Sequence, residues 1–152
     1  MSVSVKIAKP KHGWSDITIT EDGEETKESF TGIFSYIDDV LEMFLDAFKS
    51  YVDHWKGVAI TFDEEGSEFT LVIEPFSIMV IADRGKANSG FYSHRFYING
   101  EAFILNILSE LEENLPEWID FCYMDKDIDN YYLKRLQCQQ RIEYIKKRLK
   151  ET

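Results

Sequence analysis

Residues 30–55, FTGIFSYIDDVLEMFLDAFKSYVDHW, carry the most regular apolar pattern of the chain. Apolar or aromatic side chains recur at alternating steps of four and three residues, at Phe30, Phe34, Ile37, Leu41, Phe44, Phe48, Tyr51 and Trp55. Steps of this kind bring side chains to one side only in an α-helix. The pattern therefore predicts a long amphipathic helix over 30–55 that ends before Gly57.

Carboxylates occupy the side of this predicted helix that faces away from the apolar seam. They are Asp38, Asp39, Glu42, Asp46 and Asp53, with Lys49 the one base among them. Carboxylates at i and i+4 repel one another in the free protein, and a basic partner would relieve that repulsion. We therefore predict a partner-binding surface here, for which Tyr36 or Met43 would supply an apolar anchor. The acidic turn Asp63, Glu64 and Glu65 extends it, and a merely solvated helix face is the alternative.

The net charge limits the classes of partner that the chain can bind. The 152 residues carry 28 acidic and 17 basic side chains, for a formal net charge of −11. A body this acidic repels nucleic acid and anionic lipid, whose binding depends on Lys and Arg, and it attracts basic proteins. We expect a basic protein partner, no nucleic acid and no membrane. The other interpretation is that the charge serves solubility alone.

Length and composition indicate one globular domain over residues 1–152. The 11 Phe, 8 Tyr and 3 Trp argue against disorder, which requires few aromatic side chains. No apolar run is long enough to predict a membrane-spanning helix, and residues 1–14 lack the features of a secretory signal. Cys122 and Cys138 show neither a zinc spacing nor a disulfide framework. We therefore expect reduced thiols and a cytoplasmic protein.

Strand patterns follow the predicted helix. Alternating apolar residues predict strands at 58–62, 69–73, 76–82 and 91–98, with 17–20 as a candidate fifth. Helical spacing returns at 101–114 and 127–150, with a short helical turn at 117–123. The sequence thus predicts an α+β fold. In it, an antiparallel sheet of four to five strands packs against the long helix near the N-terminus, and two further helices lie toward the C-terminus.

No motif for catalysis, a cofactor or a metal stands out. Asp125, Asp127 and Asp129 resemble a calcium loop, but Asn130 stands where that loop needs glycine and Leu136 where it needs glutamate. The loop before the last predicted strand contains glycine and lysine but lacks the phosphate-binding pattern. We therefore expect a non-catalytic protein-binding module with no cofactor and no metal.

Two other functions stay open at this point. One is a small enzyme or ligand-binding domain whose site is assembled from distant residues such as His94, Arg95 and Tyr97. The other is a regulatory or scaffold homodimer. In such a dimer, the basic end of the last helix, KKRLK, would meet the acidic body of a second copy.

In size, acidity and α+β pattern, the chain resembles bacterial immunity proteins that neutralise toxin domains, including those of contact-dependent inhibition systems. The stretch that carries this resemblance is residues 37–42, IDDVLE, in the acidic face of the predicted helix. The resemblance implies a small, single-domain, cytoplasmic inhibitor that blocks a basic toxin domain through its acidic surface.

Overall fold

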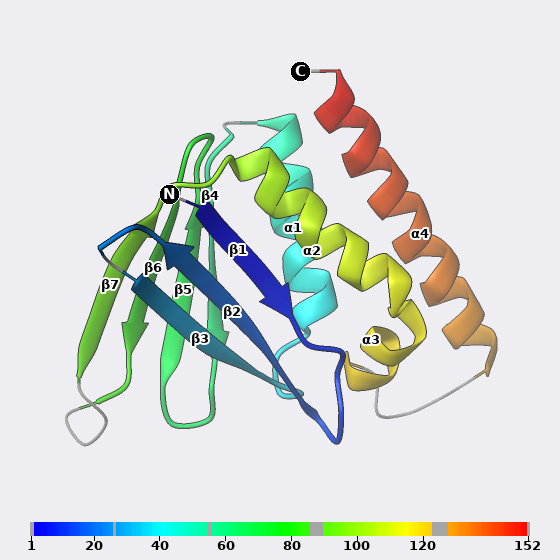
Figure 1. Cartoon of the computed structure of the whole chain (residues 1–152). Coiled ribbons are helices and arrows are strands. Elements are labelled where there is room, and N and C mark those ends of the chain that lie inside the picture. Colours follow the sequence, from blue (N-terminus) through cyan, green and yellow to red (C-terminus); the bar gives the residue numbers. More distant parts are fainter. Residues whose placement is uncertain (1, 26, 55, 86–89, 123–127, 152) are drawn as a thin grey trace.

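The computed structural model describes residues 2–25, 27–54, 56–85, 90–122 and 128–151, which form two antiparallel sheets and a set of helices (Figure 1). Sheet A consists of β1 (Ser2–Ile7), β2 (Trp14–Asp22) and β3 (Lys27–Ser35), in that order. Sheet B consists of β4 (Val58–Asp63), β5 (Glu68–Ile73), β6 (Ile78–Asp83) and β7 (Phe91–Phe96), in that order. The helices are α1 (Val40–Asp53), α2 (Gly100–Glu113), α3 (Leu115–Cys122) and α4 (Ile128–Lys150).

The predicted α+β class is confirmed, and so is the antiparallel meander between residues 58 and 96. The predicted arrangement differs in three respects. The strand expected at 17–20 belongs to a separate sheet, three strands precede the first helix, and the short turn expected at 117–123 is a third C-terminal helix. The first helix is therefore not the N-terminal element that the sequence predicted.

The helix predicted over 30–55 is wrong in its first third. Residues up to Ser35 form β3, and α1 begins only at Val40. A step of four residues fits a strand as well as a helix, because 4 is a multiple of the strand period of 2. Phe30 and Phe34 point into the core from β3, whereas Thr31 and Ile33 between them are exposed. The helix starts where the Asp39 carboxylate accepts a hydrogen bond from the Glu42 N–H at 3.2 Å and so caps the first turn.

Sheet A packs face to face on the inner side of sheet B through aromatic rings. The Phe30 ring lies 5.5 Å from that of Phe69 and 5.3 Å from that of Tyr92, measured between centroids. A Cβ atom built on Gly32 would lie 2.5 Å from the Phe69 ring, closer than any real contact. The two sheets approach this closely because residue 32 has no side chain.

The helices cover the core on the side of the molecule away from β7 (Figure 1). Helix α1 packs on β4 and on α4, and α2 runs beside β1. In Figure 1 the helices stand on one side of the molecule and β7 is the outermost strand on the other. The outer face of sheet A carries hydroxyl pairs between Thr18 and Thr31 and between Thr20 and Ser29.

We predict that Gly32→Ala lowers the free energy of unfolding by about 2 kcal/mol, as expected for an overpacked core. Phe69→Leu would make room for the added methyl group. The double variant should therefore lose less stability, measured by urea unfolding, than the sum of the two single losses. Additive losses would mean that the Phe69 ring does not limit the approach of the sheets.

Candidate functional site

The carboxylates of α1 that were predicted to face a partner instead face α4. Glu42 forms ion pairs with Lys134 and, at 2.5 Å, with Arg141. Arg141 also reaches Asp46, again at 2.5 Å. At the other end of α1, the Asp53 carboxylate accepts from Lys49 at 2.7 Å and from the Tyr144 hydroxyl at 2.6 Å, and Arg148 lies 3.5 Å away.

These contacts hold the groups in their charged forms. Burial alone would raise the pKa of the Glu42 carboxyl, but the hydrogen bonds and charges of Lys134 and Arg141 outweigh it and lower this pKa. Burial also works against the charged forms of Lys134 and Arg141, yet the bonds to Glu42 raise the pKa of both. The hydrogen bond from Lys49 lowers the pKa of Asp53.

The prediction that Glu42, Asp46 and Asp53 form a free acidic surface is therefore wrong. The sequence held the missing signal, because the bases of α4 recur every seven residues at Lys134, Arg141 and Arg148. Residues seven apart share one side of a helix, so these bases meet the carboxylates at 46 and 53, which are also seven apart. Two helices with matched stripes of opposite charge favour pairing with each other.

The three residues of the predicted acidic turn have different roles, and Glu64 is structural. Its side chain is only 3% exposed. The carboxylate accepts from the Ile33 N–H at 3.0 Å, from the Ser67 hydroxyl at 2.8 Å, and from both Nε and Nη2 of Arg84 at 3.3 and 3.0 Å. The same Arg84 donates to the Thr31 carbonyl at 2.7 Å and lies over the Phe30 ring. Glu64 and Arg84 thus tie two loops of sheet B to β3.

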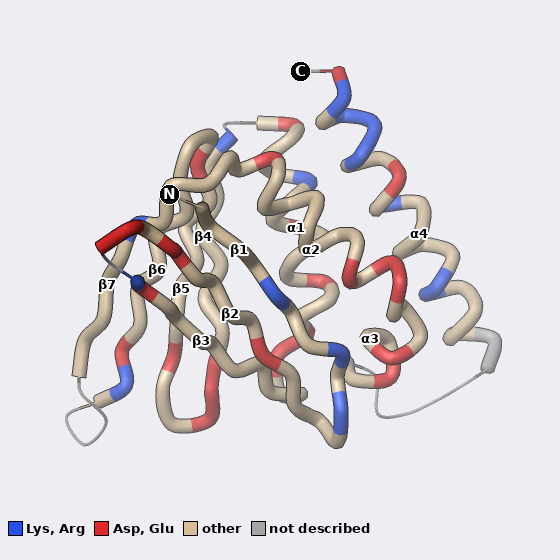
Figure 2. Tube along the Cα trace, viewed as in Figure 1, with Lys and Arg blue, Asp and Glu red and all other residues tan. Residues whose placement is uncertain are grey.

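Three further carboxylates lie where β3 leads into α1 and where β4 turns into β5, those of the half-buried Asp38 and of the exposed Asp63 and Glu65. In Figure 2 acidic segments occur in several parts of the chain, and the β4–β5 turn is one of them. Asp38 accepts from the Asp63 N–H at 2.6 Å, and Asp63 accepts from the Glu65 N–H at 2.7 Å. Glu65 accepts from the Ser35 hydroxyl at 2.7 Å. Burial raises the pKa of Asp38, as does the charge of Asp63, against the opposing effect of its backbone hydrogen bond. Among the described residues, no Lys or Arg forms an ion pair with these three carboxylates.

Large apolar side chains lie beside these carboxylates. Trp14, Ile33, Tyr36 and Ile37 are between 42% and 50% exposed, and we call these four residues the Trp14 patch. Trp14 is paired with Ser35 across β2 and β3, and Ile33, two residues before Ser35 on β3, lies on the same outer face. The Tyr36 ring packs over Gly13, next to Trp14. The carboxylates of Asp38, Asp63 and Glu65 border this patch, because the Ser35 hydroxyl bonds to Glu65 and Asp38 follows Ile37.

The residues considered for a ligand site do not come together. His94 points toward sheet A, with Nε2 at 3.7 Å from the Glu21 carboxylate and its ring against Phe96. Arg95 points to the opposite face of sheet B, where it bonds to Glu74 and Ser77. Tyr97 is 67% exposed beyond the strand end. Neighbours on a strand face opposite sides, so His94 and Arg95 cannot line one pocket.

Comparisons with models of protein families, with curated proteins and with solved structures find no match. In the described ranges, no cluster of His, Cys, Asp or Glu has the arrangement of a metal site. Residues 125–129, which resemble a calcium loop, lie outside the part of the chain whose side chains are described, and so does Cys122. Cys138 is a buried free thiol. No helix of the described chain has the length and apolar character needed to cross a membrane.

We predict that Glu64→Gln destabilises the protein by about 3 kcal/mol in urea unfolding, because it leaves Arg84 without its counter-charge in a mostly buried site. Glu68→Gln serves as the control. Glu68 is an exposed carboxylate that begins β5 directly after the same turn, so its substitution should change stability by no more than about 0.5 kcal/mol. Equal effects of the two substitutions would remove the structural role of Glu64.

A second prediction concerns pH. The folded state lowers the pKa of Glu42 below its usual 4.5, so the charged carboxylate stabilises the fold above pH 4.5, and this contribution is lost as pH falls through the lowered value. Glu42→Gln should cost about 2 kcal/mol at pH 7. The difference from the unsubstituted protein, followed by unfolding at a series of pH values, should shrink below pH 4.5. A constant difference down to pH 3 would contradict the ion-pair assignment.

Proposed function

We propose that the chain is a non-catalytic protein-binding module that recognises a basic protein through the Trp14 patch and the carboxylates of Asp38, Asp63 and Glu65. The observation that carries this proposal is the meeting of four exposed apolar side chains with three carboxylates that have no cation of their own in the described chain. Interfaces concentrate their binding energy in aromatic and apolar residues surrounded by a polar rim.

The aromatic residues of the patch are suited to this role. Trp and Tyr are the side chains most enriched among residues that dominate interface energies, and both expose nearly half of their surface here. The backbone beneath them is held by hydrogen bonds, because Trp14 and Ser35 are paired in the ladder of sheet A and the Tyr36 N–H donates to the Gly13 carbonyl at 3.2 Å. A surface ordered before binding loses little conformational entropy on association.

The three carboxylates would select the partner. Their side chains already accept hydrogen bonds from the protein, so their positions are set, yet no Lys or Arg in the described chain forms an ion pair with them. Basic side chains on a partner would pair with them and accelerate association at low salt. The chain's net charge of −11 adds a long-range attraction toward any basic protein.

A bacterial immunity protein is the functional class that fits this chemistry best. Such an inhibitor would act in the cytoplasm, bind the basic toxin domain made by the same cell, and block it without any catalytic step. The size of the chain, its acidity and the hydrogen-bonded backbone of the Trp14 patch support this proposal. The α1 face first considered for the contact does not, because its carboxylates already pair with α4.

The test uses the C-terminal domain of the protein encoded next to this gene as the probe. We expect that domain to inhibit bacterial growth and co-expression of this chain to restore it. In surface plasmon resonance, Trp14→Ala and Tyr36→Ala should each weaken binding roughly 30-fold, which corresponds to about 2 kcal/mol. A probe that neither binds nor inhibits growth would contradict the immunity assignment.

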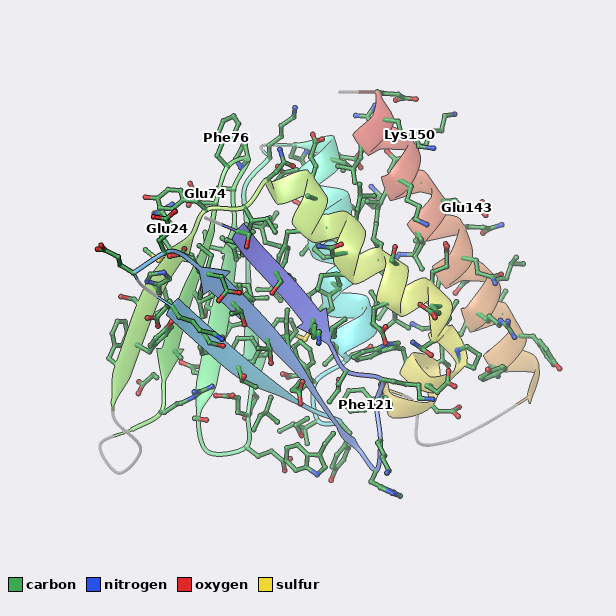
Figure 3. All side chains as sticks on the ribbon, viewed as in Figure 1. Glu24, Glu74, Phe76, Phe121, Glu143 and Lys150 are labelled. Atoms are coloured by element: carbon green, nitrogen blue, oxygen red, sulfur yellow. The ribbon has the colours of Figure 1, made fainter. Side chains whose placement is uncertain are left out.

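Variants that remove charge distinguish the electrostatic attraction of the partner from its apolar contact with the Trp14 patch. Asp38→Asn, Asp63→Asn and Glu65→Gln together keep the hydrogen-bond acceptors but remove three charges, and should lower the association rate about tenfold at low salt. The matched control removes three exposed charges elsewhere, by Glu24→Gln, Glu113→Gln and Glu143→Gln. Figure 3 shows Glu24 in the β2–β3 turn and Glu143 on α4. Equal rate losses in both triple variants would mean that net charge, and not this surface, attracts the partner.

A further inference from the structure

Three of the four sheet edges in the described chain are closed by other parts of the molecule. Helix α2 lies along β1, and α1 packs against β4. On β3, the Ile33 N–H and the Thr31 carbonyl are bound by the side chains of Glu64 and Arg84. Strand β7 is the exception, since it pairs only with β6 at the end of sheet B and is the outermost strand in Figure 1.

The hydrogen bonds of the β6–β7 hairpin determine which backbone groups of β7 are free. The Arg84 N–H donates to the Gly90 carbonyl at 3.0 Å, so residues 84 and 90 form a bonded pair. Bonded and non-bonded pairs alternate along an antiparallel ladder. The pairs of residues 92, 94 and 96 with β6 are therefore bonded, and the N–H and C=O groups of Phe91, Ser93 and Arg95 point away from the sheet.

We propose that β7 is a dimerisation edge at which a second copy of this chain adds its own β7 in antiparallel orientation, centred on Ser93. In this register, Ser93 faces Ser93 of the second copy and Phe91 faces Arg95 of the second copy. All three residues with outward groups then pair with one another, giving about six backbone hydrogen bonds. A shift of the centre to Tyr92 or His94 would leave one of these residues without a partner inside the strand.

The side chains are complementary in the same register. Phe91 is 70% exposed, and its ring would lie beside the side chain of Arg95 of the second copy. Because Glu74 and Ser77 hold the guanidinium of Arg95 within its own chain, the ring would pack on the apolar stem of that side chain. On the inner face, the half-buried Tyr92 and His94 would face each other across the new pair and be covered further.

Antiparallel addition also limits the repulsion between two chains of charge −11. Asp63, Glu68 and Asp83 are neighbours across the ladder at one end of sheet B. A two-fold axis at Ser93 places these carboxylates of the two copies at opposite ends of the joined sheet. The edge lacks the lysines, prolines and bulges with which exposed strands usually prevent such pairing.

Ser93→Pro tests the proposal without disturbing the monomer, because the N–H that it removes faces solvent in the single chain and edge strands tolerate proline there. In sedimentation equilibrium from low to high micromolar concentration, we expect the unsubstituted chain to dimerise. Ser93→Pro should raise the dissociation constant roughly 100-fold or more. Ser93→Val, which keeps the N–H, is the matched control and should still dimerise. A monomer at every concentration, or equal dimerisation of all three chains, overturns the proposal.

Two further measurements hold even if the proline variant folds poorly. Hydrogen exchange at the amides of Phe91, Ser93 and Arg95 should slow as concentration rises, while those of Tyr92, His94 and Phe96 stay protected throughout. In a Cys122→Ser background, Ser93→Cys should oxidise to a linked dimer, because bonded antiparallel pairs hold their Cα atoms about 5.5 Å apart. If exchange at the three amides does not depend on protein concentration, or slows only when the toxin-domain probe is added, then a second copy does not bind at the β7 edge.

Discussion

The ion pair between Glu64 and Arg84 joins the two sheets at the point where no backbone ladder connects them. A carboxylate and a guanidinium take the places that a neighbouring strand would occupy beside β3, one accepting from the Ile33 N–H and the other donating to the Thr31 carbonyl. An unpaired backbone group at this half-buried edge would be costly. Arg84 also stacks on Phe30, so polar and apolar contacts between the sheets are made by the same side chain.

Ion pairs within the fold reduce the number of carboxylates that can attract a partner. Many of the carboxylates that give the net charge are already used within the fold, Glu64 by Arg84 and the α1 row by the bases of α4. The net charge calculated from the sequence therefore overstates the acidic surface that is available to a partner. What distinguishes Asp38, Asp63 and Glu65 is that they are held in place by hydrogen bonds but not neutralised by a described cation.

Local patterns predicted the parts of the fold that depend on neighbouring residues. The four strands of sheet B alternate cleanly and are separated by turn residues, so their order and pairing followed from the sequence. The start of α1 did not, because Phe30 and Phe34 are spaced in a way that both periods allow. The exposure of Tyr36 was predicted, and its role as an anchor stays a prediction, whereas Trp14 was not considered, since only the long-range pairing of β2 with β3 brings it beside Tyr36.

The two proposed surfaces lie at opposite edges of sheet B, which has a consequence for recognition. The carboxylates that border the Trp14 patch belong to the β4 end of the sheet, whereas self-association would use β7. Pairing through β7 therefore leaves the patch of each copy uncovered, and one dimer presents two patches related by a two-fold axis. Two linked sites bind a two-fold symmetric or repeated basic partner far more tightly than one site does, without any new contact, provided that their spacing matches.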